Sequence, residues 1–96
     1  MNENAARDSI VDRARSLYER GYAHGSSGNL SVRVADGILV TPTGSSLGRL
    51  DPARISKVAH DGRTLSGDPP SKEAFLHLAV YANRPAAGAI VHLHCC

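Results

Sequence analysis

One stretch decides the fold of this chain: Leu30-Ser31-Val32-Arg33-Val34-Ala35-Asp36-Gly37-Ile38-Leu39-Val40. Apolar and polar residues alternate over 30–34, which is the pattern of a strand with one face in a core. Asp36-Gly37 is a dipeptide that often joins antiparallel strands, and the apolar run 38–40 then supplies the returning strand. The stretch therefore predicts a β-hairpin.

Before this hairpin, apolar residues recur at helical spacing. Ile10, Val11, Ala14, Leu17 and Tyr18 form one stripe of an amphipathic helix over 5–20, which we expect to end near Gly21. The segment 21–29 is rich in Gly and Ser and reads as a loop.

After the hairpin, turn residues dominate 41–48, which we expect to be an ordered loop. Asp51-Pro52 has the form of an N-cap followed by a proline at the first helical position, so a short helical turn should begin there. The runs 57–59 and 64–65 flank a second Asp-Gly, at 61–62, and predict a second small hairpin.

The last third of the chain predicts one helix and one strand. Ser71 can cap a helix that ends before Pro85. Its expected buried stripe consists of Ala74, Phe75, Leu78, Ala79 and Ala82. The near-continuous apolar run 87–94 is typical of a strand that is buried on both faces.

Composition limits the class of protein. Ninety-six residues with 42% hydrophobic and 21% charged content predict one globular domain. The net charge of +2, with acidic and basic residues interspersed, gives no reason to expect a nucleic acid or membrane partner. No signal-like N-terminus or long apolar segment is visible, and the adjacent Cys95 and Cys96 suggest no disulfide framework, so we expect a cytoplasmic protein.

His92 and His94 lie two residues apart in the last predicted strand, so both imidazoles should share one face. Imidazole nitrogen suits Zn²⁺ and other divalent first-row ions, although a catalytic zinc site normally has three protein ligands. A thiolate of Cys96 is a less favoured way to add one. His24, His60 and His77 have no partner in the sequence, and we expect them on the surface or on a helix face.

Three further segments carry groups that bind anions: 26–29, 43–46, and Ser71-Lys72 at a helix start. Together they offer backbone N–H groups, hydroxyl groups and one lysine, which are the parts of a phosphate site, although Gly and Ser also occur in ordinary turns. Glu73 follows directly. A carboxylate in a first helical turn often only complements the helix dipole, but beside a metal it can act as a general acid/base.

Four motifs occur in a characteristic order: Gly25-Ser26-Ser27-Gly28-Asn29-Leu30-Ser31, Val40-Thr41-Pro42-Thr43-Gly44, Pro70-Ser71-Lys72-Glu73 and His92-Leu93-His94. In this order they resemble the class II aldolase/adducin family, over nearly the whole chain. The resemblance implies an α/β, three-layer α/β/α fold with a central, mostly antiparallel sheet, of which this chain is the N-terminal part. It also implies a homotetramer with active sites at subunit interfaces.

The resemblance further implies residue roles. The substrate phosphate would be bound by Gly28, Asn29, Thr43, Gly44, Ser71 and Lys72. Glu73 would be the catalytic acid/base, and His92 and His94 would be two of three ligands of Zn²⁺ or another divalent metal. The substrate would be a small phosphorylated sugar or sugar acid, cleaved beside a carbonyl to leave an enediolate whose charge the metal stabilises.

Within the family, the motifs look most like those of decarboxylases that convert 3-oxo-tetronate 4-phosphate to dihydroxyacetone phosphate. Fuculose-phosphate aldolases, which release an aldehyde, usually have serine where Lys72 stands. A non-catalytic domain like the adducin head and a degenerate fragment are the alternatives from other classes. Because the family's third histidine lies beyond His94, we expect the metal site of these 96 residues to be incomplete and the isolated chain to be inactive.

Overall fold

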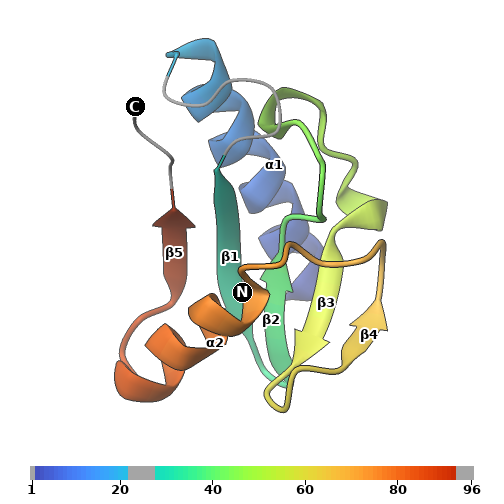
Figure 1. The fold of residues 1–96 in the computed structure, drawn as a ribbon. Coiled ribbons are helices and arrows are strands. Elements are labelled where there is room, and N and C mark those ends of the chain that lie inside the picture. Colours follow the sequence, from blue (N-terminus) through green and yellow to red (C-terminus); the bar gives the residue numbers. More distant parts are fainter. Residues whose placement is uncertain (1, 22–27, 93–96) are drawn as a thin grey trace.

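Five strands form a single sheet in the order β4-β3-β2-β1-β5, with every neighbouring pair antiparallel. The computed structural model describes residues 2–21 and 28–92. The strands are β1 (Asn29–Val34), β2 (Gly37–Val40), β3 (Ser56–Ala59), β4 (Thr64–Ser66) and β5 (Ala89–His92). Two α-helices, α1 (Glu3–Glu19) and α2 (Ala74–Asn83), cover opposite faces of the sheet, and two short 3-10 turns, η1 (Leu47–Arg49) and η2 (Pro52–Arg54), connect β2 to β3 (Figure 1). The predicted three-layer α/β/α fold is confirmed.

Both predicted hairpins are confirmed. β1 and β2 pair through a two-residue turn, with Val34 opposite Gly37. β3 and β4 pair around the second Asp-Gly, with a register irregularity between Lys57 and Val58. Gly37 has a different role from the expected turn glycine, because its φ is not positive. A Cβ on Gly37 would lie only 2.0 Å from the carbonyl oxygen of Val58, so glycine is needed for the close approach of β2 to β3.

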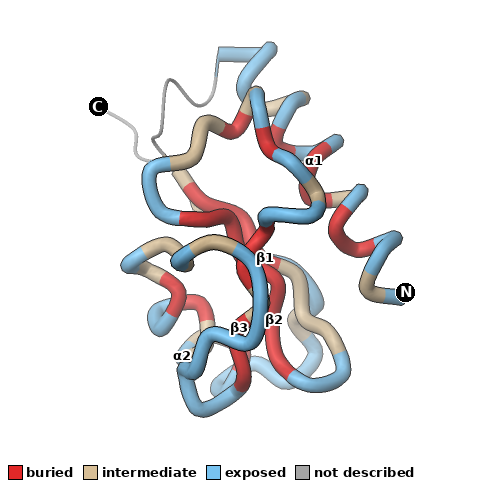
Figure 2. The backbone as a smooth tube through the Cα atoms, turned by 90° about the vertical axis from the view of Figure 1, so that its right-hand side faces the viewer, coloured by how far each residue is buried: buried red, intermediate tan, exposed pale blue. Residues whose placement is uncertain are grey.

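The buried part of β1 lies in the middle of the molecule (Figure 2), and its alternate residues face different helices. Leu30 faces α1 and joins a cluster of buried residues, and Val32 and Val34 pack against it. The members of this cluster are Ala6, Ile10, Val11, Ala14, Leu30, Leu39, Leu47, Leu50 and Ile55. Asn29 and Ser31, the alternate positions, face α2 and are also buried. The α2 layer therefore packs on buried polar side chains of β1 beside its own apolar cluster.

The predicted buried stripe of α2 is only partly correct. Ala74 is buried and Leu78 packs against the core, but Phe75 is 74% exposed, and Ala79 and Ala82 are exposed as well. His77 and Tyr81 occupy the inward face instead, because Ser31 of β1 offers them a hydrogen-bond partner. The helix also begins later than expected, at Ala74, and the Ser71 hydroxyl accepts a hydrogen bond from the backbone N–H of Glu73 in the preceding turn.

The prediction that the last strand is buried on both faces is wrong. β5 pairs with β1 at the edge of the described sheet, and its exposed and half-buried residues alternate. Val91 is 52% exposed, whereas Ile90 packs against the α2-side cluster. A strand covered on one face alternates in burial, and the apolar composition of 87–94 did not reveal this.

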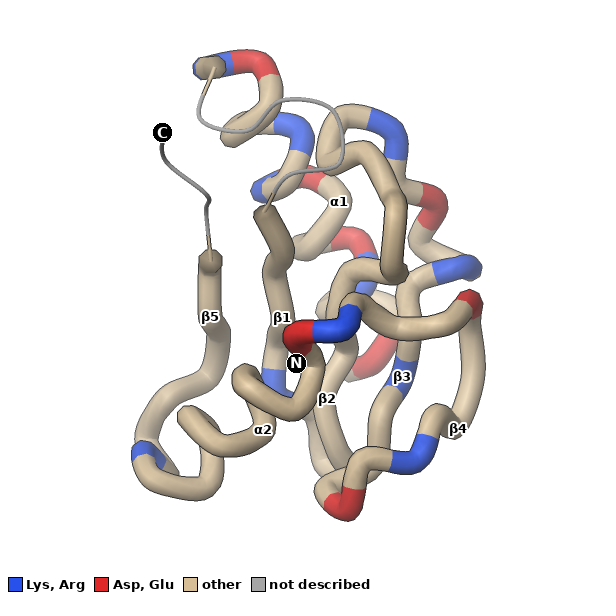
Figure 3. Tube along the Cα trace, viewed as in Figure 1, with Lys and Arg blue, Asp and Glu red and all other residues tan. Residues whose placement is uncertain are grey.

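Acidic and basic residues are interspersed along the part of the chain that is drawn (Figure 3). Among the described residues, no helix has the length and apolar character needed to cross a membrane.

Candidate functional site

Three segments far apart in the sequence meet at one pocket of about 170 Å³. Its lining consists of Gly28, Asn29, Pro42, Thr43, Gly44, Ser71, Lys72 and Glu73. All six residues predicted to hold a phosphate therefore lie around one cavity, together with the predicted acid/base. The sequence alone placed these residues in three separate segments, two rich in Gly and Ser and one at a helix start.

Backbone hydrogen bonds hold the three segments together. The N–H of Thr41 donates to the carbonyl of Leu30 at 3.0 Å, and the Thr41 carbonyl accepts from the N–H of Ser71 at 3.1 Å. The N–H of Thr43 donates to the carbonyl of Pro69 at 2.9 Å. Pro42 and Pro70 form an isolated bridge between these bonds. Strand-like backbone pairing therefore contributes to holding the three segments around the pocket.

Two glycines of the pocket have left-handed backbone conformations. Gly28 has a φ of 83° and Gly44 a φ of 69°. L-residues with a side chain seldom adopt this region, which explains the need for glycine at both positions. For Gly44, a Cβ would meet no atom within 4 Å, so its conformation rather than crowding requires the glycine.

Glu73 lies at the N-cap position of α2, where its carboxylate has two polar neighbours. Oε2 accepts a hydrogen bond from Nδ2 of Asn29 at 2.6 Å and lies 2.5 Å from Nδ1 of His92. Both side chains are half-buried, with the His92 side chain 35% and the Glu73 side chain 31% exposed. The carboxylate therefore sits between the pocket and β5, within reach of a ligand in the pocket.

His77 lies on a face of α2, one of the two places expected for it, but this face is the buried one. It is 1% exposed, and its ring bridges two residues of β1: Nδ1 lies 2.6 Å from Oγ of Ser31, and Nε2 is hydrogen-bonded to Oδ1 of Asn29. Burial lowers the pKa of the His77 imidazole, and the nearby His92 adds to this effect while Glu73 opposes it. A signal was available in retrospect, because His77 follows Glu73 by four residues and so shares its helix face.

The described residues could supply part of a binding site for a divalent metal, through the imidazole of His92. With Nδ1 of His92 directed to a carboxylate, Nε2 remains as the atom that could bind a metal, an arrangement common for metal-bound histidines. His94, the second predicted ligand, lies outside the described residues. Within 2–21 and 28–92, no group of three or more His, Cys, Asp or Glu side chains is arranged to hold an ion.

The fold and the site define a class of protein, namely an α/β/α domain with a small pocket, an adjacent carboxylate from Glu73 and a histidine on β5. Residues 8–96 match the family model described as the class II aldolase and adducin N-terminal domain. The chain belongs to this family.

Two curated relatives show the range of named activities. The 3-oxo-tetronate 4-phosphate decarboxylase of Escherichia coli is 57% identical over 93 residues, which are 96% of this chain and 44% of that protein. The L-fuculose phosphate aldolase of Escherichia coli is 37% identical over 94 residues, covering 98% of this chain and 44% of that protein.

Among solved structures, YgbL of Escherichia coli superposes with a TM-score of 0.93 at 54% identity, covering 98% of this chain and 46% of that one. The chain thus spans less than half the length of the relatives that it matches. Members of this family include proteins named as decarboxylases and aldolases, which are lyases.

Proposed function

We propose that this chain carries the phosphate-binding and acid/base half of the active site of a metal-dependent carbon–carbon lyase. The observation that supports this most directly is the convergence of Gly28, Thr43, Gly44 and Ser71 on one pocket bordered by Glu73. A pocket of about 170 Å³ is of a size for a phosphate group and its nearest atoms rather than for a whole sugar phosphate, so the rest of the substrate would extend past Glu73.

The chemistry follows from the position of Glu73. Its carboxylate lies next to the pocket, so a substrate held by its phosphate would present the carbon beside its carbonyl to Oε2. Glu73 would deliver or accept a proton there. A divalent metal held by His92, His94 and a further ligand would supply a Lewis acid for the carbonyl oxygen.

We propose decarboxylation of 3-oxo-tetronate 4-phosphate as the reaction, because relatives with that name reach 57% identity and those named L-fuculose phosphate aldolase reach 46%. The expectation from the family resemblance that fuculose-phosphate aldolases have serine at the position of Lys72 supports the same choice. Aldol cleavage of a fuculose-type phosphate is the alternative. A cytoplasmic location and a homo-oligomeric assembly are part of this proposal.

Phosphate binding can be tested on the 96-residue chain itself. Titration with inorganic phosphate, followed by ¹H–¹⁵N NMR, should shift the amide signals of Gly28, Gly44 and Lys72 together. Lys72→Met should weaken binding about three- to tenfold, since one cation near an anion contributes roughly 1 kcal/mol. Arg63→Met is the matched control, because it removes one exposed cation on the β3–β4 turn, outside the pocket. Equal affinities of the two variants would contradict the assignment.

The reaction can be tested in a chimera in which residues 1–92 of this chain replace the aligned part of the Escherichia coli decarboxylase. With Zn²⁺, the chimera should release carbon dioxide from 3-oxo-tetronate 4-phosphate, and Glu73→Gln should lower kcat by roughly 10²–10⁴-fold. Release of an aldehyde from fuculose 1-phosphate instead would favour the aldolase. A fully active Glu73→Gln chimera would overturn the acid/base role.

Zinc titration of the 96-residue chain tests the metal half of the proposal. Because a catalytic zinc site normally takes three protein ligands, we expect binding weaker than micromolar. Sub-micromolar binding that is lost in His92→Ala would show that these residues already complete a metal site.

A further inference from the structure

A chain of hydrogen bonds links the part-buried Glu73 carboxylate to buried side chains of β1 and α2, and the donor of each bond follows from the groups involved. An ionised carboxylate only accepts hydrogen bonds, so the group of Asn29 that faces Oε2 must be the amide nitrogen, at 2.6 Å. The other end of that amide is then Oδ1, which also only accepts. The ring atom Nε2 of His77, which is bonded to Oδ1, must therefore carry a proton.

The same reasoning extends past the ring to β1 and back to α2. A neutral imidazole that is protonated at Nε2 accepts at Nδ1, so the hydroxyl of Ser31, 2.6 Å away, donates to it. Ser31 then accepts at 2.8 Å from the hydroxyl of Tyr81. All donors point in one direction, from Tyr81 through Ser31, His77 and Asn29 to Glu73.

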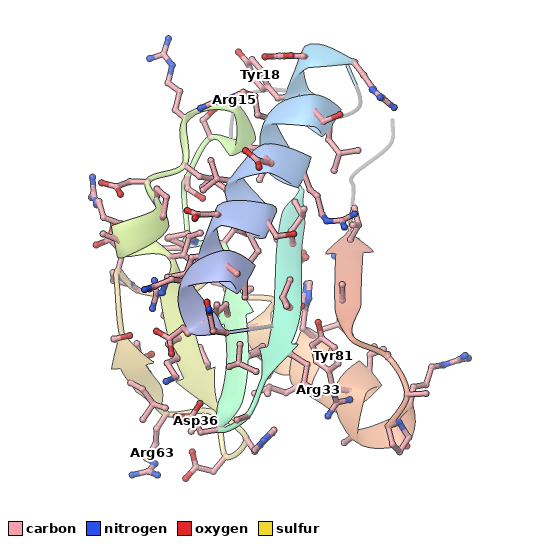
Figure 4. The ribbon with its side chains drawn as sticks, turned by 180° about the vertical axis from the view of Figure 1, so that it is seen from behind. Arg15, Tyr18, Arg33, Asp36, Arg63 and Tyr81 are labelled. Carbon is pink, nitrogen blue, oxygen red and sulfur yellow. The ribbon has the colours of Figure 1, made fainter. Side chains whose placement is uncertain are left out.

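Burial and charge maintain this arrangement. Ser31 and His77 are each 1% exposed, Tyr81 2% and Asn29 4%, so water cannot replace a lost partner without opening the helix–sheet contact. Burial lowers the pKa of His77 and raises the pKa of the Tyr81 phenol, which favours the neutral ring and the protonated hydroxyl. Arg33 holds Tyr81 in place, since its guanidinium lies 4.8 Å from the centre of the Tyr81 ring and donates a hydrogen bond to the Tyr81 carbonyl (Figure 4).

We propose that His77 is a positioning residue for Glu73. Held as the Nε2–H tautomer by Ser31 and Tyr81, it orients the amide of Asn29 so that the amide N–H groups face the carboxylate and the pocket. This inference rests on the proposed acid/base role of Glu73 and adds to it, because Asn29 then orients the acid/base as well as lining the phosphate pocket.

The alternative is that His77 only fills a buried polar site, and two variants separate these roles. In His77→Gln, the amide nitrogen can occupy the place of Nε2 and donate to Asn29. In His77→Asn, the shorter side chain can reach Ser31 but not Asn29. Both variants keep a polar amide in the same buried position, so a purely structural role predicts similar effects.

The readout is NMR of the 96-residue chain, which requires no catalytic activity. Ring ¹H–¹⁵N correlations of the wild type should show a proton on Nε2 of His77 and none on Nδ1. The two side-chain N–H signals of Asn29 should have widely separated proton chemical shifts, because only one of the two protons is hydrogen-bonded to the Glu73 carboxylate. We expect that separation to persist in His77→Gln and to be lost in His77→Asn.

In the active chimera described above, His77→Gln should keep kcat within about threefold, and His77→Asn should lower it about tenfold with KM little changed. A wild-type His77 protonated at Nδ1 would overturn the proposal even if no variant folded. Identical Asn29 signals in the two variants would overturn it as well. An inactive wild-type chimera would instead contradict the lyase proposal, and the NMR result would still decide the role of His77.

Discussion

Gly37→Ala should strongly destabilise this domain, because the added methyl group would collide with the backbone of the neighbouring strand. The added Cβ would lie 2.0 Å from the Val58 carbonyl oxygen and 2.9 Å from its carbonyl carbon. Distances below 3.0 Å are essentially never seen for real Cβ atoms, and both obstructing atoms belong to the backbone. β2 and β3 would have to separate by about 1 Å, in a region where Ile38 and Val58 are fully buried.

Overpacking of this kind costs about 1–3 kcal/mol, and we expect the upper end because no side-chain rotation relieves the contact. Against a total stability of roughly 5–15 kcal/mol, a loss of about 3 kcal/mol is a large fraction. With a slope of about 1.5 kcal/mol per molar urea, the unfolding midpoint should fall by roughly 2 M. Far-UV circular dichroism is the suitable probe, since the chain contains no tryptophan.

Gly88→Ala is the matched control. Its Cβ would meet no atom within 4 Å and its φ is not positive, so the same methyl addition should change stability by less than about 1 kcal/mol. Midpoints for the two variants that agree within 0.3 M, roughly 0.5 kcal/mol, would refute the argument from close approach.

Three further outcomes are expected. Ile10→Ala should cost about 2–5 kcal/mol in urea unfolding, because Ile10 is 0% exposed at the centre of the α1-side core. Burial places the pKa of folded His77 below its usual 6.5, so the stability that the neutral ring contributes is fully present above pH 6.5 and is lost as the pH falls below 6.5. His77→Gln should reduce the slope of unfolding free energy against pH in this range. An unchanged slope would show that another group is responsible. The Lys57 ammonium, with Nζ 2.7 Å from Oε1 of Glu3, lowers the pKa of Glu3 from its usual 4.5. The stability that this pair contributes is therefore present above pH 4.5 and is lost on acidification. Lys57→Met should make the melting temperature fall less steeply at acid pH.

Local sequence patterns predicted most of the elements because each pattern reflects one nearby physical cause. The alternation of 30–34 placed β1, and Asp51 does cap the turn at η2, where its carboxylate accepts from the N–H of Ala53 at 2.9 Å. The motif order identified the family, and it also named the residues that line the pocket.

The failures have a common origin in long-range contacts. Phe75 is more apolar than His77, yet His77 is buried, because Asn29 and Ser31 present polar groups to that face of α2 from β1. The partner that decides the orientation of the helix lies 46 residues away in the chain, outside the window of any periodicity argument. The apolar composition of β5 likewise gave no information on how many of its faces are covered or how many strands pair with it.

The pairing of β5 with β1 also has a consequence for how the site forms during folding. Strands β1 to β4 follow one another as a meander of local contacts, whereas Asn29 meets Glu73 across 44 residues, and His92 reaches its partner on β1 only when the chain closes a longer loop. Closing such a loop carries an entropic cost before its contacts form, so non-local pairings tend to form late. We therefore expect strands β1 to β4 to assemble first and the Glu73 carboxylate to reach Asn29 and His92 in the final step. In refolding followed by amide hydrogen exchange, protection at Asn29 should appear later than protection at Val40.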